Sequence, residues 1–334
     1  MSRWLKVTLV LIAITLVGIA GLFYQINSAF NLPLNIVGNK EFVVNKGHFA
    51  HYVINRLGEN GWVKHPLLVK AALKIEPELA NIKSGTYEIK FGMSARELFE
   101  ILSKGKEKTF DITLVEGLTW ADWLTQLNNH PRLTPSAKTA QQWIAFLNSE
   151  LEGGSIEGWL LADTYQFTQA TPVEDIVRRA HISMTQYLAH AWQIRALDLP
   201  YQSPYEALIM ASIIEKETGV ARERPHIASV FVNRLRENMR LQTDPTVIYG
   251  MGEAFDGNIR RKDLRQPTPY NTYVIKGLPP TPISMPSRLS IDAALQPLDT
   301  TDYYFVSKGD GSHYFSETLD EHNRAVREYQ LKKR

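Results

Sequence analysis

A glutamate near the end of a predicted helix is the residue of this 334-residue chain best suited to chemistry. Ser203, Pro204 and Glu206 have the spacing of a helix start: an N-cap serine, a proline in the first helical position and a glutamate three residues after the cap. The predicted helix runs to Glu217, and Gly219 is suited to leaving it. The sequence therefore places a carboxyl group in the last turn of a well-defined helix.

Two neighbouring glutamates of this helix have different predicted surroundings. Residues advance by about 100° around a helix axis, so three apolar side chains lie within roughly 60° of Glu217: Met210, Ile213 and Ile214. Glu215 is rotated about 160° away from Glu217. We therefore expect only Glu217 to be desolvated, and we expect replacement of Glu215 by glutamine to have a mild effect.

A carboxyl group in an apolar pocket can serve as a proton donor. Burial disfavours its ionised form, so its pKa rises and it can remain protonated near neutral pH. A general acid of this kind is what cleavage of a glycosidic bond requires. The alternative is that Glu217 only occupies a last helical turn, where an acid is slightly unfavourable against the helix dipole. The helix pattern alone leaves both interpretations open.

Long strings around this helix resemble the motifs of the YceG-like family. In the family's order they are Glu157–Tyr165, Met210–Thr218, Ala228–Leu235, Met239–Gly250, Tyr270–Tyr273 and Gly277–Pro280. The resemblance covers nearly the whole chain beyond its first helix. In that family the catalytic acid is the second glutamate of the Glu-Lys-Glu-Thr string, which is Glu217 here. The resemblance implies a membrane-anchored lytic transglycosylase that cuts within the glycan strands of peptidoglycan.

The implied mechanism uses one residue for two proton transfers. Glu217 protonates the oxygen between N-acetylmuramic acid and N-acetylglucosamine, then takes the proton of the muramic C6 hydroxyl, which closes into a 1,6-anhydro end. One rival is a hydrolytic muramidase that uses Glu217 with Asp244. A rival from another class is a non-catalytic peptidoglycan-binding scaffold. The resemblance also implies proximity to peptidoglycan synthases, although the sequence carries no interface signature.

Six further side chains are candidates for binding the glycan. Asp244 precedes Pro245 and is either the N-cap of a short helix over 245–249 or a second carboxylate facing the sugar ring. The amides can bind sugar hydroxyls and N-acetyl groups, and the tyrosines can pack against pyranose faces: Asn233, Gln242, Asn271, Tyr249 and Tyr273. Each residue type alone is more often structural, so the motif strings supply the argument.

Composition excludes several classes of function. The net charge of +2 and the absence of a long basic stripe argue against nucleic-acid binding. The chain has no cysteine, which excludes disulfides, thiolate metal sites and cysteine nucleophiles. His226, His313 and His322 have no metal-site spacing, so we infer neither a metal nor another cofactor.

An apolar run near the N-terminus predicts a membrane-spanning segment. Residues 7–23 are uncharged, Arg3 and Lys6 precede them, and positive flanks face the cytoplasm. We therefore expect a single-pass anchor in the inner membrane with the working part in the periplasm. A cleaved signal peptide is the alternative, because residues 18–20 have the small-x-small pattern of a cleavage site. Both alternatives place the working part outside the cytoplasm.

The expected fold class is α+β, with four segments along the chain. Residues 1–26 form a cytoplasmic stub and transmembrane anchor, and residues 27–40 form a tether. Residues 41–106 form a small α+β subdomain, with strands over 41–44 and 85–90, that resembles the LysM-like subdomain of the YceG-like family. Such a unit either holds glycan or acts as a spacer. Residues 107–334 form a larger mixed α+β catalytic domain.

Several elements of the larger domain are predicted directly. The segment over 120–151 reads as helical with a proline-rich break, and a further helix is expected over 173–192. Alternating apolar residues on either side of Gly309–Gly311 predict a β-hairpin over 303–316. A last helix is expected over 320–329.

Overall fold

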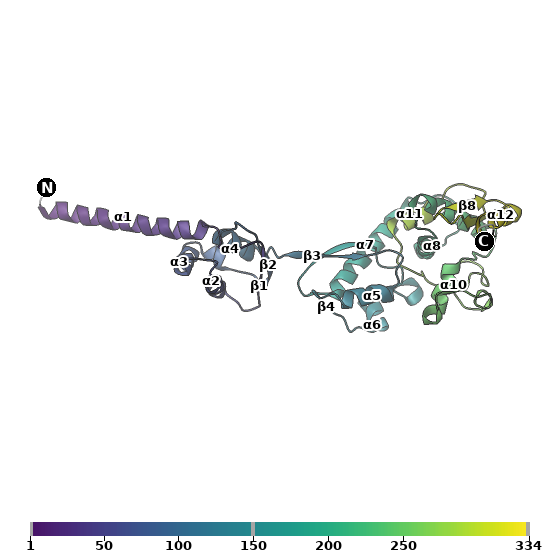
Figure 1. The fold of residues 1–334 in the computed structure, drawn as a ribbon, viewed down its shortest axis with the longest axis horizontal. Coiled ribbons are helices and arrows are strands. Elements are labelled where there is room, and N and C mark those ends of the chain that lie inside the picture. Colours follow the sequence, from purple (N-terminus) through teal and green to yellow (C-terminus); the bar gives the residue numbers. More distant parts are fainter. Residues whose placement is uncertain (1–2, 148–150, 332–334) are drawn as a thin grey trace. The chain divides into compact units, whose positions relative to one another are not determined.

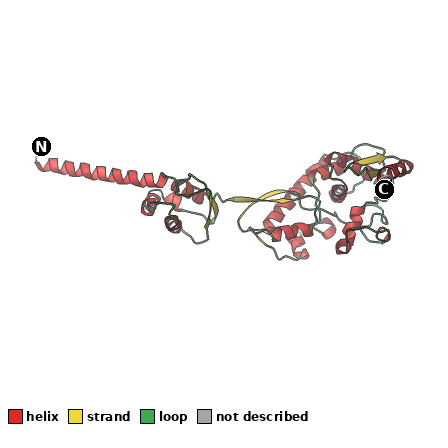
Figure 2. Ribbon diagram, in the orientation of Figure 1, coloured by secondary structure: helices red, strands yellow, loops and turns green. Residues whose placement is uncertain are grey.

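The computed structural model describes residues 3–147 and 151–331 and is a mixed α+β structure (Figures 1 and 2). The chain divides into two compact units, one made of residues 1–110 and 166–170 and the other of residues 111–165 and 171–334. Helices make up most of both units, and the strands form short two-stranded sheets.

The first unit is an α+β fold around one antiparallel strand pair. Strands β1 and β2 pair from Lys40 opposite Ile89 to Val44 opposite Gly85. The elements are α1 Arg3–Asn31, β1 Lys40–Val44, α2 Ala50–Glu59, α3 Pro66–Ile75, a 3-10 turn Pro77–Ala80, β2 Gly85–Ile89 and α4 Ala95–Lys104. Both strands agree closely with the expected ranges 41–44 and 85–90.

Helix α4 shows how closely local signals can specify an element. Ser94 Oγ accepts a hydrogen bond from the Glu97 backbone N–H, and the Glu97 carboxylate accepts one from the Ser94 N–H, which completes a capping box. Gly105 ends the helix with φ +70°, in the left-handed region that glycine adopts at low cost. Ser94-x-x-Glu97 and Gly105 carry both signals in the sequence itself.

Helix α1 is longer than the expected anchor, and its last turns belong to the first unit. The helix is long and apolar enough to cross a membrane, and its most apolar stretch has no buried residues. Ile26 and Phe30, one turn apart, are buried in the core of the unit together with Leu34 and Ile36. Phe30, Leu34 and Ile36 therefore pack into this unit while residues 37–40 are exposed, so the expectation of a free tether over all of residues 27–40 is wrong.

Phe30 packs against two side chains of α4. Its ring lies 6.3 Å from that of Phe99 on α4, and the Arg96 guanidinium lies 5.3 Å from the Phe30 ring centroid. Apolar residues four apart continue a helical stripe toward the core. The composition of this stretch is mixed, so the spacing of Ile26 and Phe30 is the sequence signal for its packing.

The second unit contains more helices than strands. Strands β3 and β5 form one two-stranded sheet, of which residues 111–114 and 163–165 belong to this unit, while β4 and β6 pair in parallel and β7 pairs antiparallel with β8. The elements are β3 Thr109–Leu114, α5 Trp120–Asn128, β4 Leu133–Thr134, α6 Ala140–Phe146, β5 Asp163–Thr168, β6 Thr171–Pro172, α7 Val173–Gln193, α8 Pro204–Glu217, α9 Arg224–Arg236, α10 Asp244–Met251, α11 Arg288–Leu295, β7 Tyr304–Ser307, β8 His313–Ser316, α12 Leu319–Val326 and a π-helical turn Arg327–Leu331.

The expected elements of this unit are largely present. The hairpin is confirmed with Tyr304 opposite Ser316, and α7 and α12 lie where helices were expected. The segment expected to be helical over 120–151 instead forms α5 and α6 with β4 between them, and residues 148–150 lie outside the described part. Pro131 and Pro135 flank β4, where proline interrupts helical hydrogen bonding.

Helix α8 is the central helix of the second unit. Every residue from Ala207 to Ile214 is buried, and α7, α9, α10 and α11 all contact the helix. Ser203 Oγ accepts from the Glu206 N–H, as the start signal predicted. A helix that is apolar all round is buried all round. The expectation that α8 buries a single apolar face is therefore wrong, because its buried residues surround the helix axis.

Truncation of Phe30 should destabilise the first unit. We expect Phe30→Ala to lower its free energy of unfolding by about 3–5 kcal/mol, because the ring is 1% exposed and its removal leaves a cavity. Hydrogen exchange of the β1 and β2 amides in the full-length protein measures this change. Val37→Ala is the control, because Val37 is 87% exposed and its change should stay within about 0.5 kcal/mol. Equal protection of these amides in both variants would mean that Phe30 does not stabilise the unit and that residues 27–40 act as a tether.

Candidate active site

Helix α8 ends at a cavity of about 490 Å³ in the second unit. The walls come from α9, the segment that leads into α10, the β7–β8 hairpin and α12. The lining residues are Glu217, Arg234, Leu241, Gln242, Asp244, Tyr273, Tyr304, Phe305, Val306, Ser307, His313, Leu319, His322, Val326 and Gln330. Polar and charged groups from several segments of the chain therefore meet around the last residue of α8.

The carboxyl of Glu217 lies at the end of α8, where this helix meets the cavity. The residue keeps partial exposure through the cavity, whereas protein surrounds its carboxyl group. Thr243 Oγ1 donates a hydrogen bond to Glu217 Oε1. Burial raises the pKa of Glu217, and the charge of Asp244 acts in the same direction. The Thr243 hydrogen bond and the charges of His313 and Arg234 oppose this shift without cancelling it.

A buried threonine cluster aims the hydroxyl that contacts Glu217. Thr243, Thr246 and Thr272 are each at most 2% exposed. The Thr243 backbone N–H donates to Thr272 Oγ1 at 3.0 Å, and Thr246 Oγ1 donates to the Thr243 carbonyl oxygen at 2.8 Å. The hydroxyls of Thr246 and Thr272 lie 2.8 Å apart. This network fixes Thr243, so the Glu217 carboxyl has a preorganised donor.

Asp244 lies at the start of α10 but does not cap it. The N-cap is Thr243, and Asp244 is the first residue of the helix. The expectation that Asp244 is the N-cap is therefore wrong by one position, because the helix begins one residue before the proline-based estimate. The Asp244 carboxylate instead accepts a hydrogen bond from the Tyr273 hydroxyl at 2.7 Å. Burial and the Asp244 charge raise the pKa of Tyr273.

Glu215 is buried as deeply as a core residue, contrary to expectation. Its side chain is 4% exposed and pairs with Arg224, which is 8% exposed, at 2.9 Å. It also accepts hydrogen bonds from the backbone N–H of Ser287 at 2.8 Å and from the Ser287 hydroxyl. The two glutamates therefore differ in their partners and not in their burial. The reason is that Arg224 of α9 and Ser287, the N-cap of α11, cover the side of α8 that carries Glu215.

Four of the seven site residues expected from the sequence line this cavity. They are Glu217, Gln242, Asp244 and Tyr273. Gln242 adopts φ +52°, a left-handed conformation that is uncommon for a residue with a side chain. Such strain is often found at functional sites.

The amide residues Asn233 and Asn271 do not line the cavity. Asn233 is buried and donates from its side-chain amide to the carbonyl oxygens of Thr300 at 2.8 Å and Asp302 at 3.1 Å. The Asn271 amide donates to two backbone carbonyl oxygens, and its side-chain oxygen accepts from the Tyr273 N–H at 3.0 Å. Both amides hold loops together, and Asn271 directly supports a cavity residue.

Tyr249 also lies away from the cavity, where it contacts a second unusual carboxyl group. Its hydroxyl donates to Glu157 Oε2 at 3.2 Å, and the Trp120 backbone N–H donates to Glu157 Oε1 at 3.0 Å. Glu157 is 4% exposed, and burial raises its pKa to about 7, with a further contribution from Asp122. Glu157 thus links the start of α5 to α10, the helix that begins with Asp244.

Arg234, Tyr304 and His313 line the cavity but were not predicted as site residues. Arg234 donates to the Leu241 carbonyl oxygen at 2.6 Å, and its guanidinium lies 5.2 Å from the Tyr304 ring centroid. His313 Nδ1 lies 2.8 Å from the Glu223 carboxylate. Arg234 belongs to one of the motif strings and was visible in principle. His313 comes from the hairpin, and no local pattern connects it with Glu217.

This arrangement is suited to acid–base chemistry. The raised pKa of Glu217 favours its protonated form, and Asp244 supplies a second carboxylate on the same cavity. Across residues 3–147 and 151–331, no group of three or more His, Cys, Asp or Glu side chains is arranged to hold a metal ion.

The chain matches the model of a known protein family. The model of the YceG-like family matches residues 42–328. The chain belongs to the YceG-like family. The match extends over both units and includes every residue of the cavity up to Val326.

Two curated relatives of this YceG-like chain carry the same name. A protein of Bacillus subtilis (strain 168) named endolytic murein transglycosylase is 34% identical over 269 residues, which cover 75% of this chain and 74% of that protein. The protein of that name from Streptococcus pneumoniae serotype 2 (strain D39 / NCTC 7466) is 25% identical over an alignment that covers 96% of this chain. The chain spans 64% of the length of the pneumococcal protein.

A solved structure also matches this YceG-like chain. The 2.6 Å crystal structure of a YceG-like protein from Listeria monocytogenes is 29% identical, with a TM-score of 0.49. The alignment covers 86% of this chain and 98% of that one.

Loss of the Glu215 charge should destabilise the second unit. We expect Glu215→Gln to lower the free energy of unfolding by about 3–5 kcal/mol, because Arg224 would become a buried charge without a partner. Chemical denaturation measures this loss. The double variant Glu215→Gln/Arg224→Leu is the matched control and should recover part of it, because it removes both charges. A loss below about 1 kcal/mol in the single variant would mean that solvent reaches the pair.

Glu157 should make stability depend on pH. Its folded pKa of about 7 exceeds the usual 4.5, so its contribution is complete below pH 4.5 and is lost as the pH rises toward 7. The loss should be about 3 kcal/mol. Glu157→Gln keeps an acceptor for the Trp120 N–H and cannot ionise. Unfolding free energies of wild type and variant should therefore change relative to each other between these pH values, and parallel curves would contradict the assignment.

Proposed function

We propose that this protein is a lytic transglycosylase that cleaves the bond between N-acetylmuramic acid and N-acetylglucosamine within peptidoglycan strands. The observation that carries the proposal is the buried Glu217 carboxyl, with its raised pKa, at the end of a cavity large enough for sugar rings. The names of the curated relatives support the same reaction.

Glu217 is the general acid of the first step. A carboxyl with a raised pKa keeps its proton to higher pH and can transfer that proton to the glycosidic oxygen as the bond to the muramic C1 breaks. Thr243 donates to Oε1, which leaves Oε2 as the oxygen that faces the substrate. The nearby charges of Arg234 and His313 limit the cost of the carboxylate that forms.

Glu217 is also the base of the second step. The carboxylate takes the proton of the muramic C6 hydroxyl, whose oxygen bonds to C1 and closes the 1,6-anhydro ring. The proton returns to Glu217, no water is consumed, and the residue is ready for another cycle. The attacking hydroxyl belongs to the substrate, so its proximity replaces the search for a water molecule.

The glycan contacts in this proposal fall to the residues that line the cavity. Gln242 offers an exposed amide, and Asp244 and Tyr273 form a hydrogen-bonded pair on the same wall. The paired Asp244 carboxylate can accept sugar hydroxyls, and its charge helps to keep Glu217 protonated. Asn271 supports Tyr273 from behind, while Asn233 and Tyr249 hold the surrounding loops.

A hydrolytic muramidase is the alternative that a specific observation favours. Asp244 lies on the same cavity as Glu217, and two carboxylates are the usual equipment of a glycoside hydrolase. In that reaction Asp244 would act as nucleophile or activate a water. A non-catalytic scaffold that binds glycan is the third candidate, and the raised pKa of Glu217 argues against it.

We further propose the location and division of the chain. Helix α1 anchors the protein in the inner membrane, and the short positive flank stays in the cytoplasm. Residues 41–106 form a LysM-like subdomain, and residues 107–334 form the catalytic domain in the periplasm, near peptidoglycan synthases. Recovery of the native protein without its first residues would favour the cleaved signal peptide instead.

Removal of the transferable proton should abolish the reaction. We expect Glu217→Gln to lower the release of anhydro-ended glycan from sacculi by about 10²- to 10⁴-fold, because the amide keeps the shape of the side chain but cannot act as an acid. Mass spectrometry of the digest measures this release. Chemical denaturation should show a folded variant, because the amide has no ionised form to bury.

Asp244→Asn provides the contrast between the two reactions. A transglycosylase should keep measurable release of anhydro ends in this variant, whereas a muramidase that depends on Asp244 should lose its activity. Wild-type products heavier by one water, with a reducible end, would reject the transglycosylase. A digest that releases nothing would favour the scaffold.

A further inference from the structure

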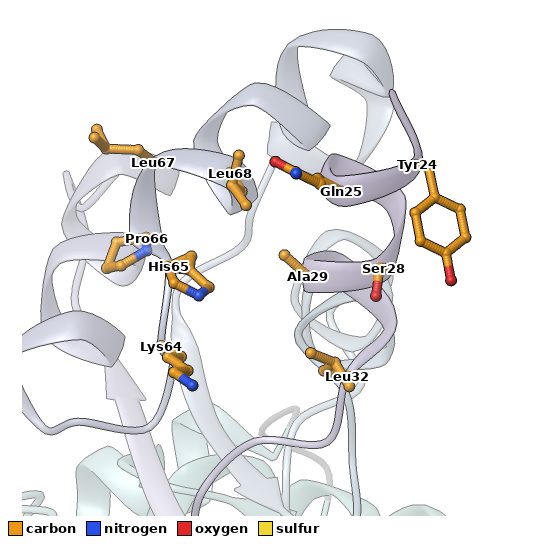
Figure 3. Close-up of a pocket in the computed structure, with 10 residues that line it drawn as sticks. All are labelled: Tyr24, Gln25, Ser28, Ala29, Leu32, Lys64, His65, Pro66, Leu67 and Leu68. Carbon is orange, nitrogen blue, oxygen red and sulfur yellow. The ribbon is translucent and has the colours of Figure 1, made fainter. Parts of the chain in front are cut away.

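The first unit has a groove beside the final turns of α1. It encloses about 680 Å³ between α1 and the segment that begins α3 (Figure 3). Gln25, Ala29 and Leu32 form one side, and residues 64–68 form the other. The cavity at Glu217 belongs to the second unit and shares no residue with this groove.

In a chain anchored through α1, helix geometry fixes how far this groove lies from the apolar core of the membrane. Helix α1 continues without a break from the apolar run into the groove, so its residues advance along the membrane normal by about 1.5 Å each. Residues 25–28 therefore lie about 3 to 8 Å beyond Phe23, the last residue of the run. A headgroup layer is about 5 to 8 Å thick on each face of a bilayer. The mouth of the groove thus lies within that layer.

The rim of the groove carries apolar and basic side chains that protein does not cover. Leu67 is 81% exposed and Leu32 is 54% exposed. Lys64 lines the groove, Lys70 follows Leu67 by one helical turn, and both lysines are exposed. Neither lysine has an ion-pair partner among the described residues. An apolar tip flanked by free ammonium groups matches the boundary between acyl chains and phosphates.

Positive charge is concentrated in the first unit, which favours its contact with an anionic surface. Residues 61–75 contain three lysines and no acid. Residues 1–110 contain 14 Lys and Arg against 8 Asp and Glu, whereas the remaining residues contain 23 against 27. The excess positive charge of the protein therefore lies in the segment that includes the proposed anchor and the first unit. Each lysine near an anionic membrane adds about 1 kcal/mol of attraction.

We propose that this groove binds the headgroup of an anionic phospholipid in the outer face of the membrane that α1 crosses. Leu67 inserts at the level of the upper acyl chains, and Lys64 and Lys70 contact lipid phosphates. The inference rests on the proposed anchoring by α1. A glycan strand or another protein could occupy the same groove, and the experiment below separates those occupants from lipid.

The absence of cysteine allows a direct measurement of lipid contact. The full-length Leu67→Cys variant, labelled with an environment-sensitive fluorophore, is reconstituted into phosphatidylcholine vesicles with or without phosphatidylglycerol. The label should move to a shorter emission wavelength and brighten when phosphatidylglycerol is present, and high salt should weaken this response. The same label at Phe91→Cys is the reference, because Phe91 is 73% exposed and lies outside the groove.

Two double variants test the role of the lysines. Lys64→Gln/Lys70→Gln should shift the ratio of lipid-bound to lipid-free groove by about 30-fold toward the lipid-free form, as expected for the loss of two charges near an anionic surface. Lys90→Gln/Lys106→Gln removes the same charge from exposed lysines elsewhere in the unit and should leave the ratio unchanged. Catalysis by Glu217 should be unaffected in both, which any glycan digest would verify.

The outcomes separate this inference from the proposals on which it rests. Flotation with the vesicles reports anchoring, and a protein that fails to float would overturn the anchor and the lipid site together. A protein that floats, but whose label at position 67 behaves like that at position 91, would overturn the lipid site alone. Equal response without phosphatidylglycerol, or equal loss in the two double variants, would also reject an anionic lipid as the occupant. A label that responds only when glycan is added would assign the groove to glycan.

Discussion

The Glu217 carboxyl is held in a nearly desolvated position with one preorganised donor, and the second unit is arranged around this constraint. Because α8 is buried along most of its length, its last residue reaches the cavity from the core and not from the surface. The buried threonines keep Thr243 aimed at Oε1. A carboxyl in this setting favours its neutral form, yet the charges of Arg234 and His313 keep the ionised form accessible. Both protonation states can therefore be occupied in turn.

Glu215 and Glu217 show that burial alone does not determine the state of a carboxyl. Both lie at the end of the same buried helix, two residues apart. Glu215 has a guanidinium at 2.9 Å and a backbone donor at 2.8 Å, so its carboxylate is paired and hydrogen-bonded. Glu217 has a single hydroxyl donor and a neighbouring negative charge, so its burial favours the protonated form. One glutamate therefore stabilises the fold, while the other is free to exchange a proton.

Local signals allowed much of this structure to be predicted. The cap at Ser203, the capping box at Ser94 and the hairpin turn at Gly309 each involve residues within a few positions of one another. The burial of Glu215 depends on Ser287, 72 residues away, and no periodicity in α8 reveals that contact. His313 reaches the cavity for the same kind of reason. Local propensity specifies elements, whereas the partners of buried charges are set by tertiary packing.

The continuity of α1 with the first unit has a mechanical consequence. Phe30 is buried against α4, so the apolar run and the folded unit are joined without a flexible hinge. For a chain anchored through α1, the tilt and rotation of the helix in the bilayer would then be transmitted to the unit as a rigid body. Its height would be fixed by helical rise, about 10 Å from Phe23 to Phe30, and not by the fluctuating extension of a flexible chain. A change in bilayer thickness that alters helix tilt would thus reorient the first unit directly.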